Sequence, residues 1–432
     1  MPPQSLYDSK HYENLLTLQG LQSWQPEQIA RYKTENIIVV DMGSTGSRMH
    51  AYNIQMSSDQ PENDIPFLTE IAIAKNQDKH AIADYCSNPK KVSEHILPIY
   101  YDLSKQLKNL NIDIEQVPIY FYATAGMRLH DKRAQTEVYK YLQKAIVLTG
   151  HSPNKIITKT ISGELEGIFD WLSINYKLQT IQNDEPTIAA LDMGGASTQV
   201  AMEYTNKNKE ENQELSSNLF LLNFADKKYT IYSNSILGYG LTQTKKNITN
   251  YDHKQAIEEC SITEQHHDSY KHNLGHDINK TDPNFNPVED SEIKNFNYLK
   301  CSNLIKLYLQ NKKEHLNIAK AIKSAIKTNM KFVAASGYYY NFNFFNSKLP
   351  EDLIKTIPDS CHTHRAKFKR KFNNISEAQL NEACFDATYL KILLNSGYKL
   401  PEGYNNFLIP KHDIDWTIGA ALFISTKQKI NA

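Results

Sequence analysis

Two short stretches of the chain combine an aspartate with small and hydroxyl-bearing residues in the same order. The first is Asp41-Met-Gly-Ser-Thr-Gly46-Ser-Arg48, and the second is Asp192-Met-Gly-Gly-Ala-Ser-Thr198. Glycines leave the backbone open, so N–H groups and hydroxyls in such turns can approach a phosphate closely. One such turn is common in any strand-rich protein. Two copies with the aspartate in register predict a duplicated unit that holds a phosphate chain from both sides.

The two aspartates predict a metal site. If strands that end at Asp41 and Asp192 lie side by side, their carboxylates face one point, and a polyphosphate binds beside them only together with a divalent cation. Mg²⁺ and Ca²⁺ prefer oxygen ligands. We therefore expect both aspartates to hold Mg²⁺ or Ca²⁺, through its waters. The phosphate chain is expected to contact the other residues of the two turns, Gly43, Ser44, Thr45, Gly46, Ser47, Arg48, Gly194, Gly195 and Ala196.

Hydrolysis needs a base that takes a proton from a water aimed in line at the terminal phosphorus. Glu166 is the best candidate, because it lies where a short strand enters a predicted helix. Thr124, Ser197 and Gln199 are neutral and can orient that water, and Arg128 can meet a phosphate or brace the loop. Taken alone, Glu166 would more often be a first-turn helix residue that responds to the helix dipole. Only its joint occurrence with the two aspartate turns favours catalysis.

Predicted strands and helices place these residues at their ends. Runs of apolar and β-branched residues predict buried strands that end at both aspartates, with further strands at 49–54, 67–74 and 117–123. Apolar residues three and four positions apart predict helices at 91–110, 131–148, 316–333 and 415–424. The strand pattern restarts at Thr187, which predicts a second lobe. The expected division is a lead-in at 1–36, a first lobe at 37–160 with the C-terminal helix 405–432, and a second lobe at 161–404.

Composition limits the classes of partner. The 432 residues can form two domains, and 48 acidic residues balance 48 basic ones, so bulk charge predicts no nucleic-acid partner. No apolar run approaches the roughly 18 residues of a membrane span. The five cysteines include no C-x-x-C pair, which argues against zinc. They are interpreted either as local loop-closing bridges or as buried thiols. Histidines within 264–277 are irregularly spaced among polar residues, which favours a solvated loop over a metal site.

Five stretches resemble, in order, the five apyrase-conserved regions of the nucleoside triphosphate diphosphohydrolases, or apyrases. They are 38–48, 123–129, 162–171, 191–199 and 335–344. The resemblance implies an α/β fold of the two-lobed, actin-like (ribonuclease H-like) kind, with duplicated mixed-sheet lobes and the active site between them. It also implies metal-dependent removal of the terminal phosphates of nucleoside tri- and diphosphates, down to the monophosphate.

The resemblance also implies residue roles. Glu166 matches the base of the family, Asp41 and Asp192 match its metal-water ligands, and Thr124, Ser197 and Gln199 match residues that place the nucleophilic water. The run Tyr338, Tyr339 and Tyr340 matches the region that stacks on the nucleobase, and every base offers a π-face for such stacking. A core strand is the alternative for this run. Because three consecutive tyrosines cannot all face one apolar side, we expect at least one at an edge, with Tyr340 the first choice.

By the same resemblance, Cys260 pairs with Cys301 and Cys361 pairs with Cys384, leaving Cys86 free. Disulfides favour an oxidising compartment, so we expect a soluble, bacterial-type member that is secreted or periplasmic, its leader removed, and acts as a monomer. Two rival functions stay open. One is another actin-like phosphotransferase or exopolyphosphatase-type hydrolase, and the other is a nucleotide-binding sensor without turnover.

Overall fold

The computed structural model describes residues 32–57, 65–76, 80–205, 213, 215–260, 296–350, 352–358, 361, 377–426 and 430–431. Residues 1–31, which make up most of the predicted lead-in, lie outside the described residues. The histidine-rich stretch 264–277 also lies outside them.

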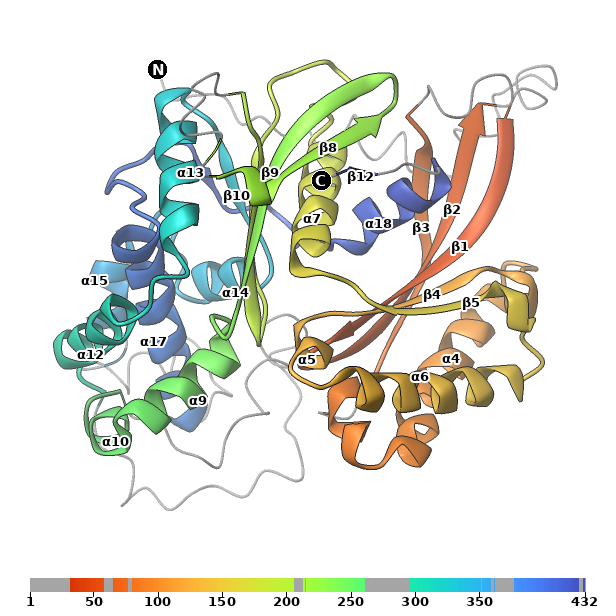
Figure 1. Cartoon of the computed structure of the whole chain (residues 1–432), viewed down its shortest axis with the longest axis horizontal. Helices are drawn as coiled ribbons and strands as arrows, with labels where there is room; N and C mark the ends of the chain where they lie inside the picture. The colour runs from red at the N-terminus through yellow and green to blue at the C-terminus, as the bar shows by residue number, and fades with distance from the viewer. Residues whose placement is uncertain are drawn as a thin grey trace.

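A five-stranded mixed sheet carries the first aspartate turn (Figure 1). Its strands are β1 (Tyr32–Gly43), β2 (Gly46–Ser57), β3 (Phe67–Lys75), β4 (Ile119–Ala123) and β5 (Ile156–Thr160). The order across the sheet is β3-β2-β1-β4-β5, and β1 pairs antiparallel with β2 and parallel with β4. The predicted hairpin and the strands expected at 49–54, 67–74 and 117–123 are therefore confirmed.

A seven-stranded sheet carries the second aspartate turn. Its strands are β6 (Ala189–Met193), β7 (Ser197–Glu203), β8 (Leu219–Phe224), β9 (Lys227–Leu237), β10 (Phe332–Ala334), β11 (Phe407–Leu408) and β12 (Ile430–Asn431). The order is β11-β10-β6-β7-β9-β8-β12, with β6 antiparallel to β7 and parallel to β10. The strands around β6 thus repeat the arrangement around β1, which confirms the predicted duplication.

Helices cover these sheets and connect their strands. They are α4 (Val92–Lys108), α5 (Ala125–Arg128), α6 (Lys132–Val147), α7 (Gly163–Lys177), α9 (Leu241–Tyr251), α10 (His253–Cys260), α12 (Tyr298–Gln310), α13 (Leu316–Lys327), α14 (Gly337–Phe344), α15 (Asp352–Pro358), α17 (Glu377–Ile392) and α18 (Thr417–Ser425). The single helix predicted at 316–333 is wrong. It ends at Lys327 because Asn329 takes a left-handed φ of 58°, a common way to terminate a helix, and the chain then enters β10.

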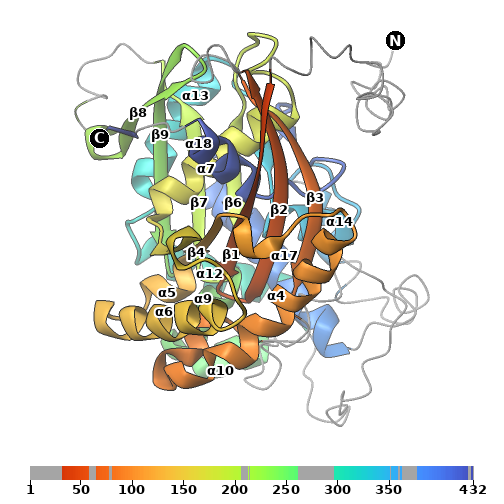
Figure 2. The ribbon, with the colours of Figure 1, turned by 90° about the vertical axis from the view of Figure 1, so that its right-hand side faces the viewer.

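Two helices, α7 and α18, lie between the two sheets, as Figure 1 shows in yellow and blue. Strand β1 is buried on both faces, so its side chains alternate between two apolar clusters. Ile38 and Val40 pack with α4 and α6 in one cluster, while Ile37 and Val39 pack with α7 and α18 in the other. Figure 2 shows β1, β2 and β3 side by side with α4 against them. The cluster that contains Ile37, Val39, α7 and α18 is named here the middle cluster, and it joins the two sheets.

The predicted disulfides are confirmed, because the structure contains Cys260–Cys301 and Cys361–Cys384, with Cys86 free. The sequence predicts that the segment 405–432 belongs with the first lobe, and it provides α18. It also contributes β11 and β12 to the second sheet. In the part of the chain that the structure describes, no helix is both long and apolar enough to span a membrane.

Candidate active site

The two predicted metal ligands lie at the ends of the two central strands and face the layer between the sheets. Strand alternation puts Asp41 on the same face of β1 as Ile37 and Val39, which belong to the middle cluster. In β6, Asp192 likewise shares a face with Ala190 of that cluster. Because helix α7 lies in this layer, the fold directs both carboxylates toward the element that carries the predicted base.

Burial makes both aspartates poor anions. Burial raises the pKa of Asp41 to about 7, against the opposing effect of Arg48. Burial, reinforced by the negative charge of Glu166, raises the pKa of Asp192 to about 8. Arg48 Nη1 lies 3.2 Å from Asp41 Oδ2. The site is therefore one in which added positive charge would be stabilised.

Helix α7 begins at an N-cap, Ser162, whose hydroxyl accepts a hydrogen bond from Leu165 N–H, and Glu166 follows in its first turn. Two of the residues predicted to lie near Glu166 contact the same carboxylate oxygen, Oε2. Arg128 Nη2 and Gln199 Nε2 each donate to Glu166 Oε2, both at 2.9 Å. Burial raises the pKa of Glu166 above its ordinary value, while Arg128 opposes that effect.

The other water-orienting candidates are divided between two places. Ser197 Oγ accepts hydrogen bonds from Arg128 Nη2 at 3.0 Å and from Gln199 Nε2 at 2.7 Å, so it belongs to the same network as Glu166. Thr124 is buried at the start of α5, and its N–H donates to the carbonyl of Met42 beside the first turn. Arg128, at the other end of α5, connects this region to the network.

The first phosphate turn, residues 43–46 and named here the β1–β2 turn, is a tight hairpin connection. A Cβ on Gly126 would lie 3.0 Å from the Cα of Ser44, so α5 packs directly against the turn. Ser44 and Thr45 remain accessible. Ser47 does not match its predicted role as a phosphate ligand: it lies in β2, is fully buried, and its hydroxyl contacts His95 Nε2 at 2.9 Å.

The second phosphate turn, residues 194–196 and named here the β6–β7 turn, connects two antiparallel strands. The N–H of Gly194 bonds the carbonyl of Ser197, closing the turn at 2.9 Å. At the carboxyl end of β6, Thr198 Oγ1 donates to the carbonyl of Asp192 at 2.7 Å. The structure thus places the turn directly between the aspartate and the Ser197 network.

The tyrosine run forms the first part of helix α14, so neither a core strand nor an edge strand is present. Tyr338 is fully buried in the core of the second sheet and is wrong as a base-stacking residue, because its ring has no exposed face. Tyr339 and Tyr340 are partly exposed, with ring centroids 5.2 Å apart. Helical rotation separates the three side chains, since consecutive residues point in different directions.

Sequence reasoning missed four polar residues around the aspartates. Ser336 donates its N–H to Asp413 Oδ1 at 2.9 Å, and its hydroxyl, which lies near Asp192, opposes the rise in the pKa of that carboxyl. Asp415 contributes negative charge near Asp41 and lies 3.7 Å from His50 Nε2. The last of the four, Asp170, lies one helical turn beyond Glu166, and burial raises its pKa well above the ordinary value. The spacing of four could have revealed this residue, whereas nothing in the sequence marks Ser336.

The carboxylates fit a divalent cation held through waters. Within the described residues, no three His, Cys, Asp or Glu side chains are grouped so that they could ligate an ion directly. Yet Asp192 Oδ1 is buried without a hydrogen-bond partner among those residues. A buried carboxylate oxygen of this kind needs a donor. The water shell of Mg²⁺ or Ca²⁺ supplies such donors and the missing positive charge.

Comparison with known proteins places this geometry in a family. The model of the GDA1/CD39 (nucleoside phosphatase) family matches residues 28–432. The chain is 25% identical over 427 residues to ectonucleoside triphosphate diphosphohydrolase 1 of Bos taurus, covering 90% of this chain and 81% of that protein. It is 24% identical over 418 residues to probable apyrase 3 of Arabidopsis thaliana, covering 90% and 82% respectively.

A solved structure shares the fold. It is that of nucleoside triphosphate hydrolases from Neospora caninum, which matches with a TM-score of 0.54 and 12% sequence identity over 97% of this chain and 96% of that chain. This likeness confirms the predicted two-lobed α/β fold.

Proposed function

The chain belongs to the GDA1/CD39 (nucleoside phosphatase) family, and we propose that it hydrolyses the terminal phosphates of nucleoside tri- and diphosphates down to the monophosphate. The relatives named as a triphosphate diphosphohydrolase and an apyrase support this substrate class. The observation that carries the proposal is the Glu166 network. A buried carboxylate is held by Arg128 and Gln199 beside Ser197, between two turns that each follow a strand-end aspartate.

The proposed reaction is an in-line attack of water on the terminal phosphorus. Arg128 and Gln199 occupy Oε2 of Glu166, while Oε1 makes no hydrogen bond with the described residues, so Oε1 takes the proton of the water. The oxygen–phosphorus bond to the water forms as the bond to the bridging oxygen breaks, and the shortened nucleotide leaves with that oxygen. Ser197 and Gln199 orient the water through their own polar atoms.

Asp41 and Asp192 would hold the divalent cation through its waters, and the cation would neutralise charge on the phosphate oxygens. The accessible hydroxyls of Ser44 and Thr45 and the amides of the β6–β7 turn would hold the phosphate chain from opposite sides. Arg48, already paired with Asp41, would brace that carboxylate.

The nucleobase of the substrate would stack on α14, where Tyr339 and Tyr340 present partly exposed rings. Tyr340 is the better candidate because it lies near both Asp413 and Arg48, and so beside the β1–β2 turn. The two confirmed disulfides support a secreted or periplasmic protein. We propose that one chain forms the complete site, as a monomer with a first lobe at 37–160 and a second lobe at 161–404, the latter completed by β11 and β12 of the segment 405–432.

A phosphate-release panel tests the function. Purified protein is assayed with ATP, ADP, GTP, UTP and tripolyphosphate, each with Mg²⁺, with Ca²⁺ or with a chelator. We expect release from both the tri- and diphosphates with either cation, and none with the chelator. Tight nucleotide binding without release would favour the sensor, whereas release from tripolyphosphate but not from nucleotides would favour the exopolyphosphatase-type reaction.

Tyr340→Ala tests the proposed nucleobase-stacking site separately. Loss of a stacked ring costs about 1–3 kcal/mol per base, so the KM for ATP should rise about tenfold while tripolyphosphate hydrolysis stays at the wild-type rate. Tyr338→Phe is the matched control, because its ring is in the core and only a hydroxyl is lost. Equal losses on ATP and tripolyphosphate in Tyr340→Ala would contradict stacking.

A further inference from the structure

The β6–β7 turn is held through its carbonyl groups. Three consecutive carbonyl oxygens accept hydrogen bonds from backbone N–H groups of one segment, at the start of α9 and just before it. The donor and acceptor pairs are Leu241 with Gly194 at 3.0 Å, Gln243 with Gly195 at 2.9 Å, and Gly238 with Ala196 at 2.8 Å. The first N–H groups of a helix have no partner within the helix, and in α9 those of Leu241 and Gln243 bind carbonyls of the β6–β7 turn.

These bonds set the direction of the amides of the turn. The described chain contains no cis peptide bond. In a planar trans peptide, the carbonyl of one residue and the N–H of the next point in opposite directions. Because the carbonyls of Gly194 and Gly195 point toward α9, the N–H groups of Gly195 and Ala196 point away from it. They are the groups expected to bind the phosphate chain.

Gly240, the N-cap residue of α9, packs against the peptide groups that join Gly195, Ala196 and Ser197. A Cβ at this position would be 2.4 Å from the nitrogen of Ala196 and 2.5 Å from the nitrogen of Ser197, both backbone atoms. Its φ of −69° is open to any residue, so glycine is required by contact and not by backbone conformation. Any larger side chain must displace either the turn or α9.

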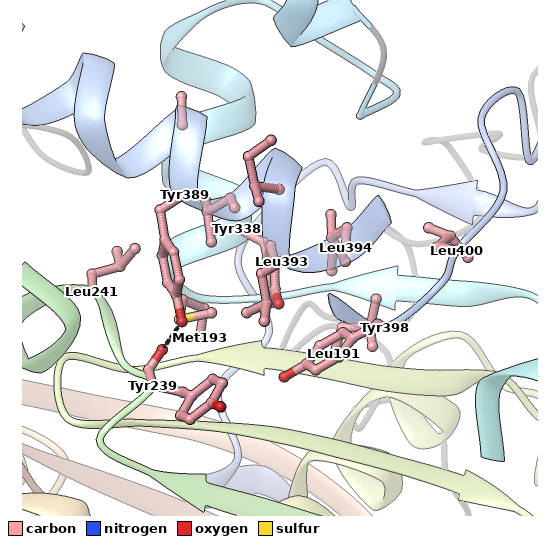
Figure 3. Close-up of a cluster of buried hydrophobic side chains, with 14 of the residues drawn as sticks. Leu191, Met193, Tyr239, Leu241, Tyr338, Tyr389, Leu393, Leu394, Tyr398 and Leu400 are labelled. Carbon is pink, nitrogen blue, oxygen red and sulfur yellow. Dashed lines mark hydrogen bonds between the residues drawn. The ribbon is translucent and has the colours of Figure 1, made fainter. Parts of the chain in front are cut away.

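The start of α9 is itself anchored to α17. The hydroxyl of Tyr389 donates to the carbonyl of Tyr239 at 2.7 Å, shown as a dashed line in Figure 3. The same figure shows Leu241 and Met193 close to this contact. One turn further along α9, buried Lys245 Nζ lies 2.9 Å from Asp386 Oδ1 of α17. The turn is thus connected through α9 to the helix that carries the disulfide residue Cys384.

We propose that Gly240 and Tyr389 are positioning residues of the reaction: they hold the start of α9 against the β6–β7 turn, so that the amides of Gly195 and Ala196 are aimed at the substrate phosphates. The proposal rests on the proposed function, since it assumes that the turn binds phosphate. It makes α9 a support specific to the phosphate chain, without contact to the nucleobase.

Steady-state kinetics on ATP and on tripolyphosphate test this proposal. Displaced amides lose charge-assisted hydrogen bonds, so we expect Gly240→Ala to raise the KM at least about tenfold, by the same factor for both substrates. Tyr389→Phe removes one anchoring bond and should raise both KM values about threefold. Tyr404→Phe is the matched control, because its hydroxyl also donates at 2.7 Å to a backbone carbonyl, that of Met330, but away from the turn.

The outcomes separate positioning from simple stability. A variant that only folds less well loses active protein, which lowers kcat and leaves the KM unchanged. Unchanged KM values in Gly240→Ala and Tyr389→Phe would therefore overturn the proposal. If Gly240→Ala does not fold, the comparison of Tyr389→Phe with Tyr404→Phe decides alone. A wild-type protein that hydrolyses none of the nucleotides would instead contradict the proposed function.

Discussion

Arg128 is the residue that connects the predicted catalytic groups. Its guanidinium donates to Glu166, to Ser197 and to the carbonyl of Ile161, while its own helix α5 packs against the β1–β2 turn. The sequence left two interpretations open, a phosphate ligand or a brace. The contacts support the second, because three of the five N–H donors of the guanidinium are engaged with protein groups.

Arg128 therefore affects the acidity of the proposed base, Glu166. Burial raises the pKa of Glu166, and the positive charge of Arg128 opposes that effect. In Arg128→Met this opposition is lost, so the pKa of Glu166 should rise further, by about 1–3 units. Since the base acts deprotonated, the acid limb of the kcat/KM profile should move to higher pH by that amount. Arg128→Lys, which keeps the charge, should show a smaller shift; an unmoved acid limb in Arg128→Met would argue against Glu166 as the base.

Residue types at the site could be predicted because the chemistry restricts them. Glu166 and the two aspartates were proposed from the need for a base and a cation, and Thr124, Ser197 and Gln199 from the need to orient a water; the resemblance to apyrases implied the same roles. The orientation of each side chain was not predictable in the same way. Ser47 failed as a phosphate ligand because strand alternation turned its hydroxyl toward His95. Tyr338 failed because the run formed a helix.

At the scale of elements, the junction of β10 and α14 is strained. Ser336, the N-cap of α14, has φ 52° and ψ −123°, a conformation that non-glycine residues rarely adopt. It is held there by its N–H bond to Asp413, and its hydroxyl lies near Asp192. Strain of this kind occurs where the surrounding structure needs a particular geometry. Here it brings a hydroxyl to a proposed metal ligand.

Two substitutions at Ser336 separate strain from hydrogen bonding. Both Ser336→Ala and Ser336→Gly lose the hydroxyl, but only glycine accepts this conformation without cost. We therefore expect the glycine variant to be more stable than the alanine variant by about 1–3 kcal/mol in urea unfolding. Stabilisation by added Mg²⁺, measured as a shift in Tm, should fall equally in both. Equal stability of the two variants would show that the backbone at Ser336 is unstrained.

Most elements could be predicted because their patterns are local. The apolar spacing in α4 and α6 and the strand runs before both aspartates depend only on neighbouring residues. The break between α13 and β10 could not be found in this way, since apolar residues continue through it. It depends on Asn329 in a left-handed conformation and on the pairing of Phe332 with Ala189, far away in the sequence.

At the scale of the whole molecule, the two sheets are held together by α7 and α18. They pack closely at Gly419, where a Cβ would lie 2.0 Å from the carbonyl oxygen of Phe169. The N–H of Gly419 also donates to Ser173 Oγ at 2.7 Å. Because α7 carries Glu166, this packing sets where the base lies relative to both aspartate turns. The duplication was readable from the repeated turns, whereas this contact depends on the three-dimensional structure.

Gly419→Ala tests that packing. Alanine favours a helix over glycine by about 1 kcal/mol, so the substitution would stabilise a helix free of tertiary contact. The overpacking expected here costs about 1–3 kcal/mol. We therefore predict a net loss in the free energy of unfolding by urea, together with reduced turnover because Glu166 is displaced. A gain in stability would show that α18 does not press on α7 at this point.

The central claim is that Glu166, brought between the two turns by the fold, is the base of nucleotide hydrolysis. Its most direct test is Glu166→Gln, which keeps the shape of the side chain and one oxygen that can accept from Arg128 and Gln199, but cannot take a proton. Loss of a general base costs at least about 100-fold in rate. We predict that kcat falls by at least this factor while ATP, measured by calorimetry with Mg²⁺, binds with wild-type affinity. Near-normal turnover in Glu166→Gln would contradict the account.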